Sequence, residues 1–216
     1  MIIDSHWFAL CLSQGPVRLD GVTYYLRNGR VCVRPSHHKK RGKRSEAELA
    51  TTGRFVEMRK LWTMYRRAVG ELPVWRVAAR EVGAGQGDTP VHRLNAGCVR
   101  SGEGVWAFPA FRFAAGSLDM PVLREARRER GIVTLEWEVD EDHAGARWSD
   151  RVYVGYFYDA EPRVPGLVEA STQRVAGQAT VEIPLLEERA DAALHLYLFF
   201  GNEDGTRFSP SVYAGV

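Results

Sequence analysis

The sequence has no long hydrophobic run and little cysteine. No stretch of about 18 consecutive apolar residues occurs, so a transmembrane helix is not expected. The apolar patch Trp7–Leu12 has no basic flank and no clear small-residue cleavage site, so we do not expect a signal peptide. The three cysteines, Cys11, Cys32 and Cys98, form no CxxC pair. This argues against a disulfide framework and a zinc site and favours a reducing, cytoplasmic location.

The sequence also lacks the short motifs of common catalytic sites. Neither G-x-S-x-G nor H-E-x-x-H occurs, and the glycine-rich stretch 83–88 lacks the Lys-Ser/Thr of a phosphate-binding loop. His37 and His38 lie among basic residues, and "DEDH" at 140–143 supplies too few convergent ligands for a calcium site. We therefore expect no enzyme, no cofactor and no metal, and no small-molecule substrate is evident. A catalytic triad assembled from distant residues stays open.

The charge of the chain is nearly balanced overall but unevenly distributed. Between Arg27 and Arg67 there are thirteen Lys or Arg residues and three Glu residues, a net charge of +10. Since the whole chain carries +2, the remainder carries −8. A basic N-terminal segment is thus joined to an acidic body.

A β-hairpin is predicted around Asn28-Gly29, a strong type I′ turn signal because both positions need positive φ. Pairing Tyr25 with Cys32 in this register places an apolar set on one face: Val22, Tyr24, Leu26, Val31 and Val33. The other face carries Thr23, Tyr25, Arg27, Arg30, Cys32 and Arg34. Because an isolated two-stranded ribbon is marginal in water, we expect the apolar face to pack and the basic face to stay exposed.

An amphipathic helix is predicted from the capping box Ser45-Glu46-Ala47-Glu48 to about Gly70. The expected buried stripe is Phe55, Met58, Trp62, Tyr65 and Val69. The expected outward residues are Arg59, Lys60, Thr63, Arg66 and Arg67. "VWRVAAREV" at 74–82 is a candidate for a second short helix.

Beyond about Phe108 the apolar period changes to two. Alternating runs occur at 133–139, 152–158, 181–183 and 194–200, separated by turn-rich segments. Short strands at this spacing with a buried Trp137 indicate an antiparallel sandwich of immunoglobulin or fibronectin type III kind. Its expected core contains Leu135, Trp137, Val154, Tyr156, Leu196 and Leu198. The predicted fold is mainly β, α+β overall, with a hairpin–helix region at 1–105 and the sandwich at 106–216.

Several segments together resemble an uncharacterised family of about 200-residue proteins from Bacteroidota. They are the ribbon residues Gly21, Tyr24, Arg34 and Pro35, the strand pair "VTLEWEVDEDHAGARWSDRVYVGYFYD" and the ending "LHLYLFFGNEDGTRFSPSVYAG". The resemblance covers about residues 20 to 216 and leaves out the first dozen. It implies a hairpin–helix segment followed by a fibronectin-like sandwich, and it implies no activity.

The basic segment is the candidate functional surface. We predict a non-catalytic interaction or assembly protein whose basic arm docks on an acidic partner or a neighbouring subunit, with protein association or self-association as the expected mode. The alternative is a non-sequence-specific nucleic-acid-binding protein that uses the same arm. A solvated connector is the third possibility. The predicted binding residues are Tyr25, Arg27, Arg30, Arg34, Lys39, Lys40, Arg41, Lys43, Arg44, Arg59, Lys60, Arg66 and Arg67. Tyr25 suits a surface for phosphate and stacking contacts if it is exposed, or else it covers a neighbouring strand.

Overall fold

The computed structural model of the chain describes residues 5–27, 29–36, 42–84, 88–139, 141–186 and 192–216. The chain forms two compact units, which we call the N-terminal unit (Met1–Glu46) and the main unit (Ala47–Val216). This division lies after residue 46, whereas the sequence predicts one between residues 105 and 106. The reason is that helices before residue 105 share a core with the sheets after it.

The N-terminal unit consists of one helix and one antiparallel sheet. Its elements are α1 (Ser5–Gln14), β1 (Val17–Leu19), β2 (Val22–Arg27) and β3 (Arg30–Pro35). The strands lie in the order β1-β2-β3, and β2 pairs with β3 in the predicted register, Tyr25 opposite Cys32. Asp20 and Gly21 both have positive φ, 49° and 74°, as a two-residue type I′ hairpin between β1 and β2 requires.

The main unit begins with three helices. They are α2 (Glu46–Val69), α3 (Val74–Glu81) and α4 (Asp88–Asn95). The predicted end of the first helix is confirmed: Gly70 has a φ of 57°, the left-handed conformation common just after a helix. Within the described ranges, no helix is both long and apolar enough to cross a membrane.

The rest of the main unit is formed by antiparallel sheets and short connections. The connecting elements are η1 (Ala96–Cys98), β4 (Val99–Arg100), β5 (Gly104–Val105), η2 (Phe108–Ala110) and η3 (Arg174–Ala176). The larger strands are β6 (Leu123–Glu129), β7 (Ile132–Trp137), β8 (Arg151–Tyr158), β9 (Gly166–Gln173), β10 (Gln178–Glu182), β11 (Leu194–Gly201) and β12 (Val212–Gly215). They form a three-stranded sheet, β10-β7-β6, and a four-stranded sheet, β12-β11-β8-β9.

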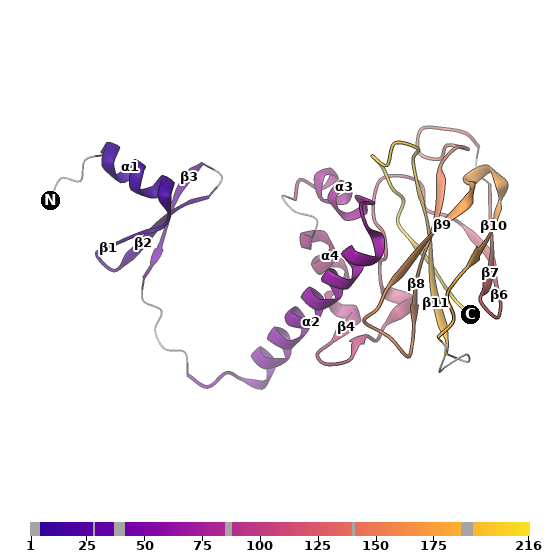
Figure 1. The fold of residues 1–216 in the computed structure, drawn as a ribbon, viewed down its shortest axis with the longest axis horizontal. Coiled ribbons are helices and arrows are strands. Elements are labelled where there is room, and N and C mark those ends of the chain that lie inside the picture. Colours follow the sequence, from indigo (N-terminus) through magenta and orange to yellow (C-terminus); the bar gives the residue numbers. More distant parts are fainter. Residues whose placement is uncertain (1–4, 28, 37–41, 85–87, 140, 187–191) are drawn as a thin grey trace. The chain divides into compact units, whose positions relative to one another are not determined.

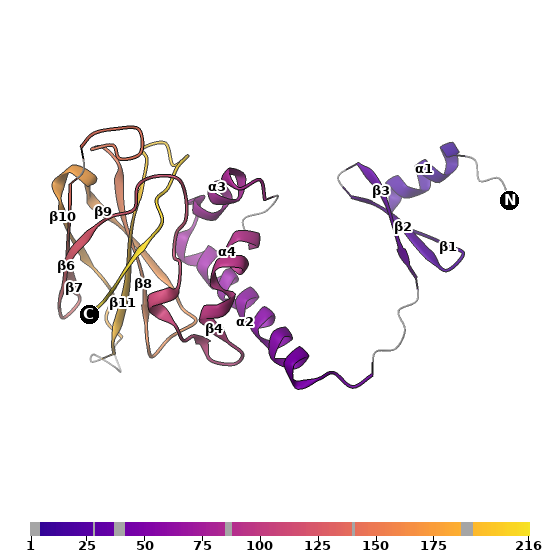
Figure 2. The ribbon, with the colours of Figure 1, turned by 180° about the vertical axis from the view of Figure 1, so that it is seen from behind.

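The four-stranded sheet lies between the other two layers, with the helices on one side and the three-stranded sheet on the other (Figures 1 and 2). Tyr153, Phe157, Tyr197 and Phe199 point to the helical side and join a core with α2 and α3. Alternate residues of the same strands face the three-stranded sheet and Trp137. Burial on both faces explains why β8 and β11 are apolar almost throughout, whereas β7 alternates.

Most of the predicted core positions are confirmed, with three exceptions. Leu135, Trp137, Val154, Leu196 and Leu198 are buried. The exceptions are Tyr156 and Trp62, which are only partly buried, and Phe55, which is exposed. The Phe55 side chain is 53% exposed because α2 turns Leu61 inward instead. Its ring lies 5.1 Å from that of His92.

Candidate interaction surfaces

The sheet of the N-terminal unit exposes the face that the sequence predicts to be covered. Helix α1 packs against β2, where Leu12 and Thr23 are buried, so the helix covers the Thr23 face. Tyr25 and Cys32, on that face, are half-buried. The prediction was wrong because helix α1, which supplies the covering layer, was not foreseen. The partial burial of Tyr25 favours the interpretation that its ring covers a neighbouring strand over that of an exposed stacking surface.

The uncovered face of this sheet is apolar across all three strands. We call it the apolar face; it consists of Val17, Leu19, Val22, Tyr24, Leu26, Val31 and Val33. None of the seven is buried, and Leu26, Val31 and Val33 are 45%, 55% and 56% exposed. A contiguous apolar surface of this kind is typical of an interaction site.

The predicted arginines of the ribbon are exposed. Arg27 pairs with Arg30 across the strands, and Arg34 lies opposite Thr23. The Arg34 guanidinium carbon is 5.6 Å from the centre of the Tyr25 ring, a cation–π distance. The ring is thus already in contact with one arginine.

The remaining predicted residues divide between the connecting segment and the main unit. Lys43 and Arg44 are exposed, while Lys39, Lys40 and Arg41 lie outside the described residues. Arg59, Lys60, Arg66 and Arg67 lie on the exposed side of α2, in the main unit. The predicted surface is therefore two sets of residues on two separate units.

Within the main unit, a groove of about 980 Å³ lies between α2 and α3. We call it the basic groove, because its lining includes Arg59 and Arg66 of α2 and Arg76 and Arg80 of α3. Arg76 and Arg80 were missed by the sequence analysis. Their spacing of four on the outer side of a short amphipathic helix is the signal that points to one shared surface.

The four arginines of the basic groove are not neutralised by neighbours. Within the described ranges, no carboxylate lies at ion-pair distance from any of them. Arg76 donates to the backbone oxygen of Glu71 at 3.4 Å. Glu71 and Asp88 also line the groove, so its lining carries a net charge of +2.

The wall of the basic groove includes Trp62, whose ring is partly exposed. It stacks on Tyr65, with ring centres 5.6 Å apart and an interplanar angle of 14°. Tyr65 is buried, and its hydroxyl donates to the backbone oxygen of Phe113 at 3.0 Å. Burial raises the pKa of Tyr65 far above its usual range, so the hydroxyl keeps its proton. Trp62 thus packs on a ring that is itself buried and hydrogen-bonded.

The segment "DEDH" forms a polar turn in its described part, 141–143. Asp142 accepts from the backbone nitrogen of Trp148 at 3.3 Å, and His143 lies 3.3 Å from Asp119. Among the residues that the structure describes, no group of three or more His, Cys, Asp or Glu side chains is placed to hold a metal ion. His37, His38 and Asp140 are outside that part of the chain.

Comparison with known proteins gives no family for the chain. No family model and no curated protein matches it.

Proposed function

We propose that this is a non-catalytic interaction protein whose N-terminal unit docks on an acidic surface of a neighbouring copy. The proposal is supported above all by the apolar face, which is uncovered and belongs to a unit rich in exposed arginine. That unit has nine Lys or Arg and three Asp or Glu residues, a net charge of +6. Residues 70–216 carry −7, a net charge opposite to that of the N-terminal unit, which favours a contact between the two segments in different copies.

The two features of the N-terminal unit have different roles in this proposal. Burying the exposed halves of Leu26, Val31 and Val33 contributes about 1 kcal/mol per side chain. Each exposed arginine contributes about 0–1 kcal/mol, and this contribution falls with salt. The apolar face therefore supplies affinity, and the arginines supply attraction and orientation.

The test is the oligomeric state, measured by light scattering after size-exclusion chromatography over a series of protein and salt concentrations. We expect the average molecular mass to grow with protein concentration and the association to weaken at high salt. The double variant Val31→Thr/Val33→Thr should raise the dissociation constant about tenfold while preserving strand propensity. The variant Arg30→Gln/Arg34→Gln should weaken association chiefly at low salt.

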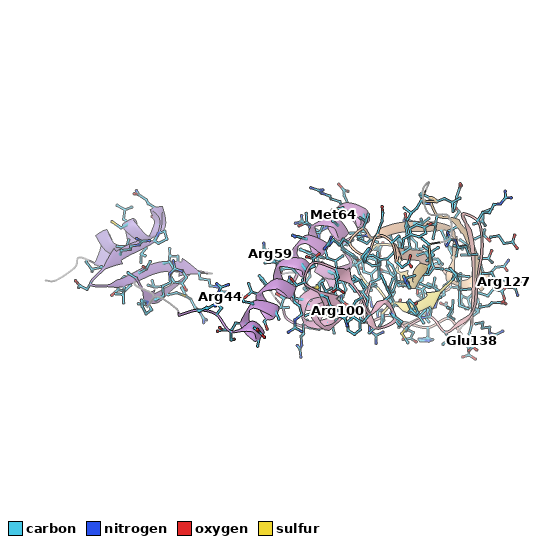
Figure 3. The ribbon with its side chains drawn as sticks, turned by 90° about the horizontal axis from the view of Figure 1, so that it is seen from below. Arg44, Arg59, Met64, Arg100, Arg127 and Glu138 are labelled. Atoms are coloured by element: carbon cyan, nitrogen blue, oxygen red, sulfur yellow. The ribbon has the colours of Figure 1, made fainter. Side chains whose placement is uncertain are left out.

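A matched control changes two exposed arginines elsewhere. Arg124 and Arg127 both lie on β6, and Figure 3 shows Arg127 at the side of the main unit away from α2. Arg127→Gln/Arg124→Gln should leave association unchanged. A monomer at every concentration would refute self-association, and association with an added acidic protein alone would reassign the partner. Equal behaviour of all variants and wild type would mean that the N-terminal unit is only a solvated connector.

The alternative is that the basic arm binds nucleic acid without sequence preference. The net charge of +6 on the N-terminal unit attracts any polyanion by counterion release. A variant with residues 39–44 changed to Ser and Gly should then lose affinity for a labelled DNA duplex and show a shallower salt dependence. Retention of both properties would exclude this use of the arm.

We also propose that the two large sheets form an immunoglobulin- or fibronectin type III-like sandwich and that the chain belongs to the uncharacterised Bacteroidota family. Seven strands divided between two antiparallel sheets, with a buried Trp137 between them, support the first proposal. An experimental structure with another strand order would refute it.

A further inference from the structure

We propose that the basic groove of the main unit binds a nucleotide, either free or as part of a single-stranded nucleic acid. This groove belongs to the main unit, and besides Arg59 and Arg66 it contains residues that the arm hypothesis does not use: Trp62, Arg76 and Arg80. The proposal also departs from the expectation that no small-molecule ligand is evident.

The lining of the basic groove is positively charged. Guanidinium groups from two helices line one hollow, and within the described ranges none is ion-paired with a carboxylate. A guanidinium presents planar donors that match phosphate oxygens in a bidentate manner, so this set suits a phosphate-bearing ligand.

The aromatic wall of the groove favours a ligand that carries a ring. The Tyr65 ring covers one side of Trp62, and its hydroxyl is fixed on Phe113, so the indole is held without losing its partial exposure. A carboxylate-rich peptide gains nothing specific from such a platform. A nucleobase does, because base–aromatic stacking adds affinity whatever the base.

The groove is large enough for such a ligand. Its volume of about 980 Å³ lies at the upper end of the usual range for ligand pockets. The groove has room for a nucleoside phosphate with its phosphates against the arginines and its ring against Trp62. Glu71 and Asp88 reduce the lining charge to +2, which leaves it attractive to an anion.

The experiment uses the full chain and three probes: ATP, inorganic triphosphate and a labelled twelve-nucleotide oligodeoxythymidine. Binding is measured by calorimetry for the first two and by fluorescence anisotropy for the third. We expect ATP or the oligonucleotide to bind at least tenfold more tightly than triphosphate, which lacks the ring. Tight binding of ATP identifies a free nucleotide as the ligand, and binding of the oligonucleotide alone identifies a single strand.

Three variants and one control test the residues of the groove. Arg76→Gln/Arg80→Gln changes exposed side chains only and should lower affinity at least tenfold, while Arg124→Gln/Arg127→Gln on β6 should not. Trp62→Leu should reduce ATP binding to the level of triphosphate. Because Trp62 also packs against the core, the thermal unfolding of the Trp62→Leu protein is measured alongside. The conservative variant Trp62→Phe should keep part of the preference for ATP.

Salt dependence separates this site from the arm. The variant Arg76→Gln/Arg80→Gln loses two phosphate contacts. For a single strand this should reduce the slope of log affinity against log salt by about 1.4. The variant with residues 39–44 changed to Ser and Gly should keep its preference for ATP over triphosphate. Equal binding of ATP and triphosphate, unchanged affinity in Arg76→Gln/Arg80→Gln, or preferential binding of a polyglutamate peptide would each overturn the proposal.

Discussion

Replacing Arg174 by methionine should destabilise the main unit by about 3–5 kcal/mol, because it removes one half of a buried ion pair. The Arg174 and Asp150 side chains are each 1% exposed, and their charged atoms are 3.1 Å apart. Arg174 also donates to the backbone oxygen of Asp119 at 2.9 Å, and its guanidinium lies 4.2 Å from the centre of the Phe200 ring. Methionine fills much of the volume but satisfies none of these acceptors.

The cost of this substitution should depend on pH. Burial raises the pKa of Asp150, while the hydrogen bond from Arg174 lowers it, so loss of Arg174 raises the pKa further. A carboxyl whose pKa is higher in the folded state takes up a proton more readily when folded. Stability relative to wild type is therefore recovered as the pH falls toward about 4, the unfolded value. We expect a smaller cost at pH 5 than at pH 7.

Urea unfolding followed by circular dichroism at pH 7 and pH 5 measures both effects. In a separate thermal scan at pH 7, the midpoint temperature should fall by roughly 6–20 °C, at 2–4 °C per kcal/mol for a unit of this size. Arg151→Met is the matched control, because its pair with Glu169 is half-exposed and should contribute no more than about 1 kcal/mol. Asp150→Asn/Arg174→Met should be more stable than Arg174→Met alone. A cost below 1 kcal/mol, or one that does not shrink at pH 5, would refute the reasoning.

Two further predictions concern glycine and cysteine. Gly155→Ala should lower the stability of the main unit by more than 1 kcal/mol in urea unfolding, because an added Cβ would lie 2.5 Å from the Phe113 ring; an unchanged midpoint would contradict this packing. Replacing Cys11, Cys32 and Cys98 with alanine should leave self-association intact, with any stability cost arising at Cys98, whose pKa is raised by burial; loss of association with folding preserved would show that a thiol takes part.

The strands and helices that have a strong local signal were predicted from the sequence, and those that depend on neighbours were not. The hairpin register followed from one turn, and β8 and β11 from their apolar runs. Strand β1 was missed although Asp20-Gly21 is itself a turn signal. Strand β9 has weak alternation and was also missed. The second covered face of the four-stranded sheet appears in no local pattern, because it depends on where α2 and α3 pack.

The candidate site shows the same limit. The arginines on α2 were recognised from their spacing, but their grouping with Arg76 and Arg80 required the packing of α2 against α3. Trp62 was assigned to the core, since its position in the apolar stripe says nothing about partial exposure. The covered face of the N-terminal sheet was also predicted wrongly from the sequence. The position of α1 decides which face is covered, and no local pattern shows it.

The place of β11 in the sheet has a consequence for the order in which the protein can be made. This strand supplies side chains to the cores on both sides of the four-stranded sheet. It follows every other large element in the sequence except β12, which pairs with it. During synthesis the helices and the three-stranded sheet therefore emerge before the strand that completes their shared centre. Until β11 is made, the apolar faces of the helices and of the three-stranded sheet stay exposed. A chain interrupted before Leu194 would present these two faces to chaperones and proteases at the same time.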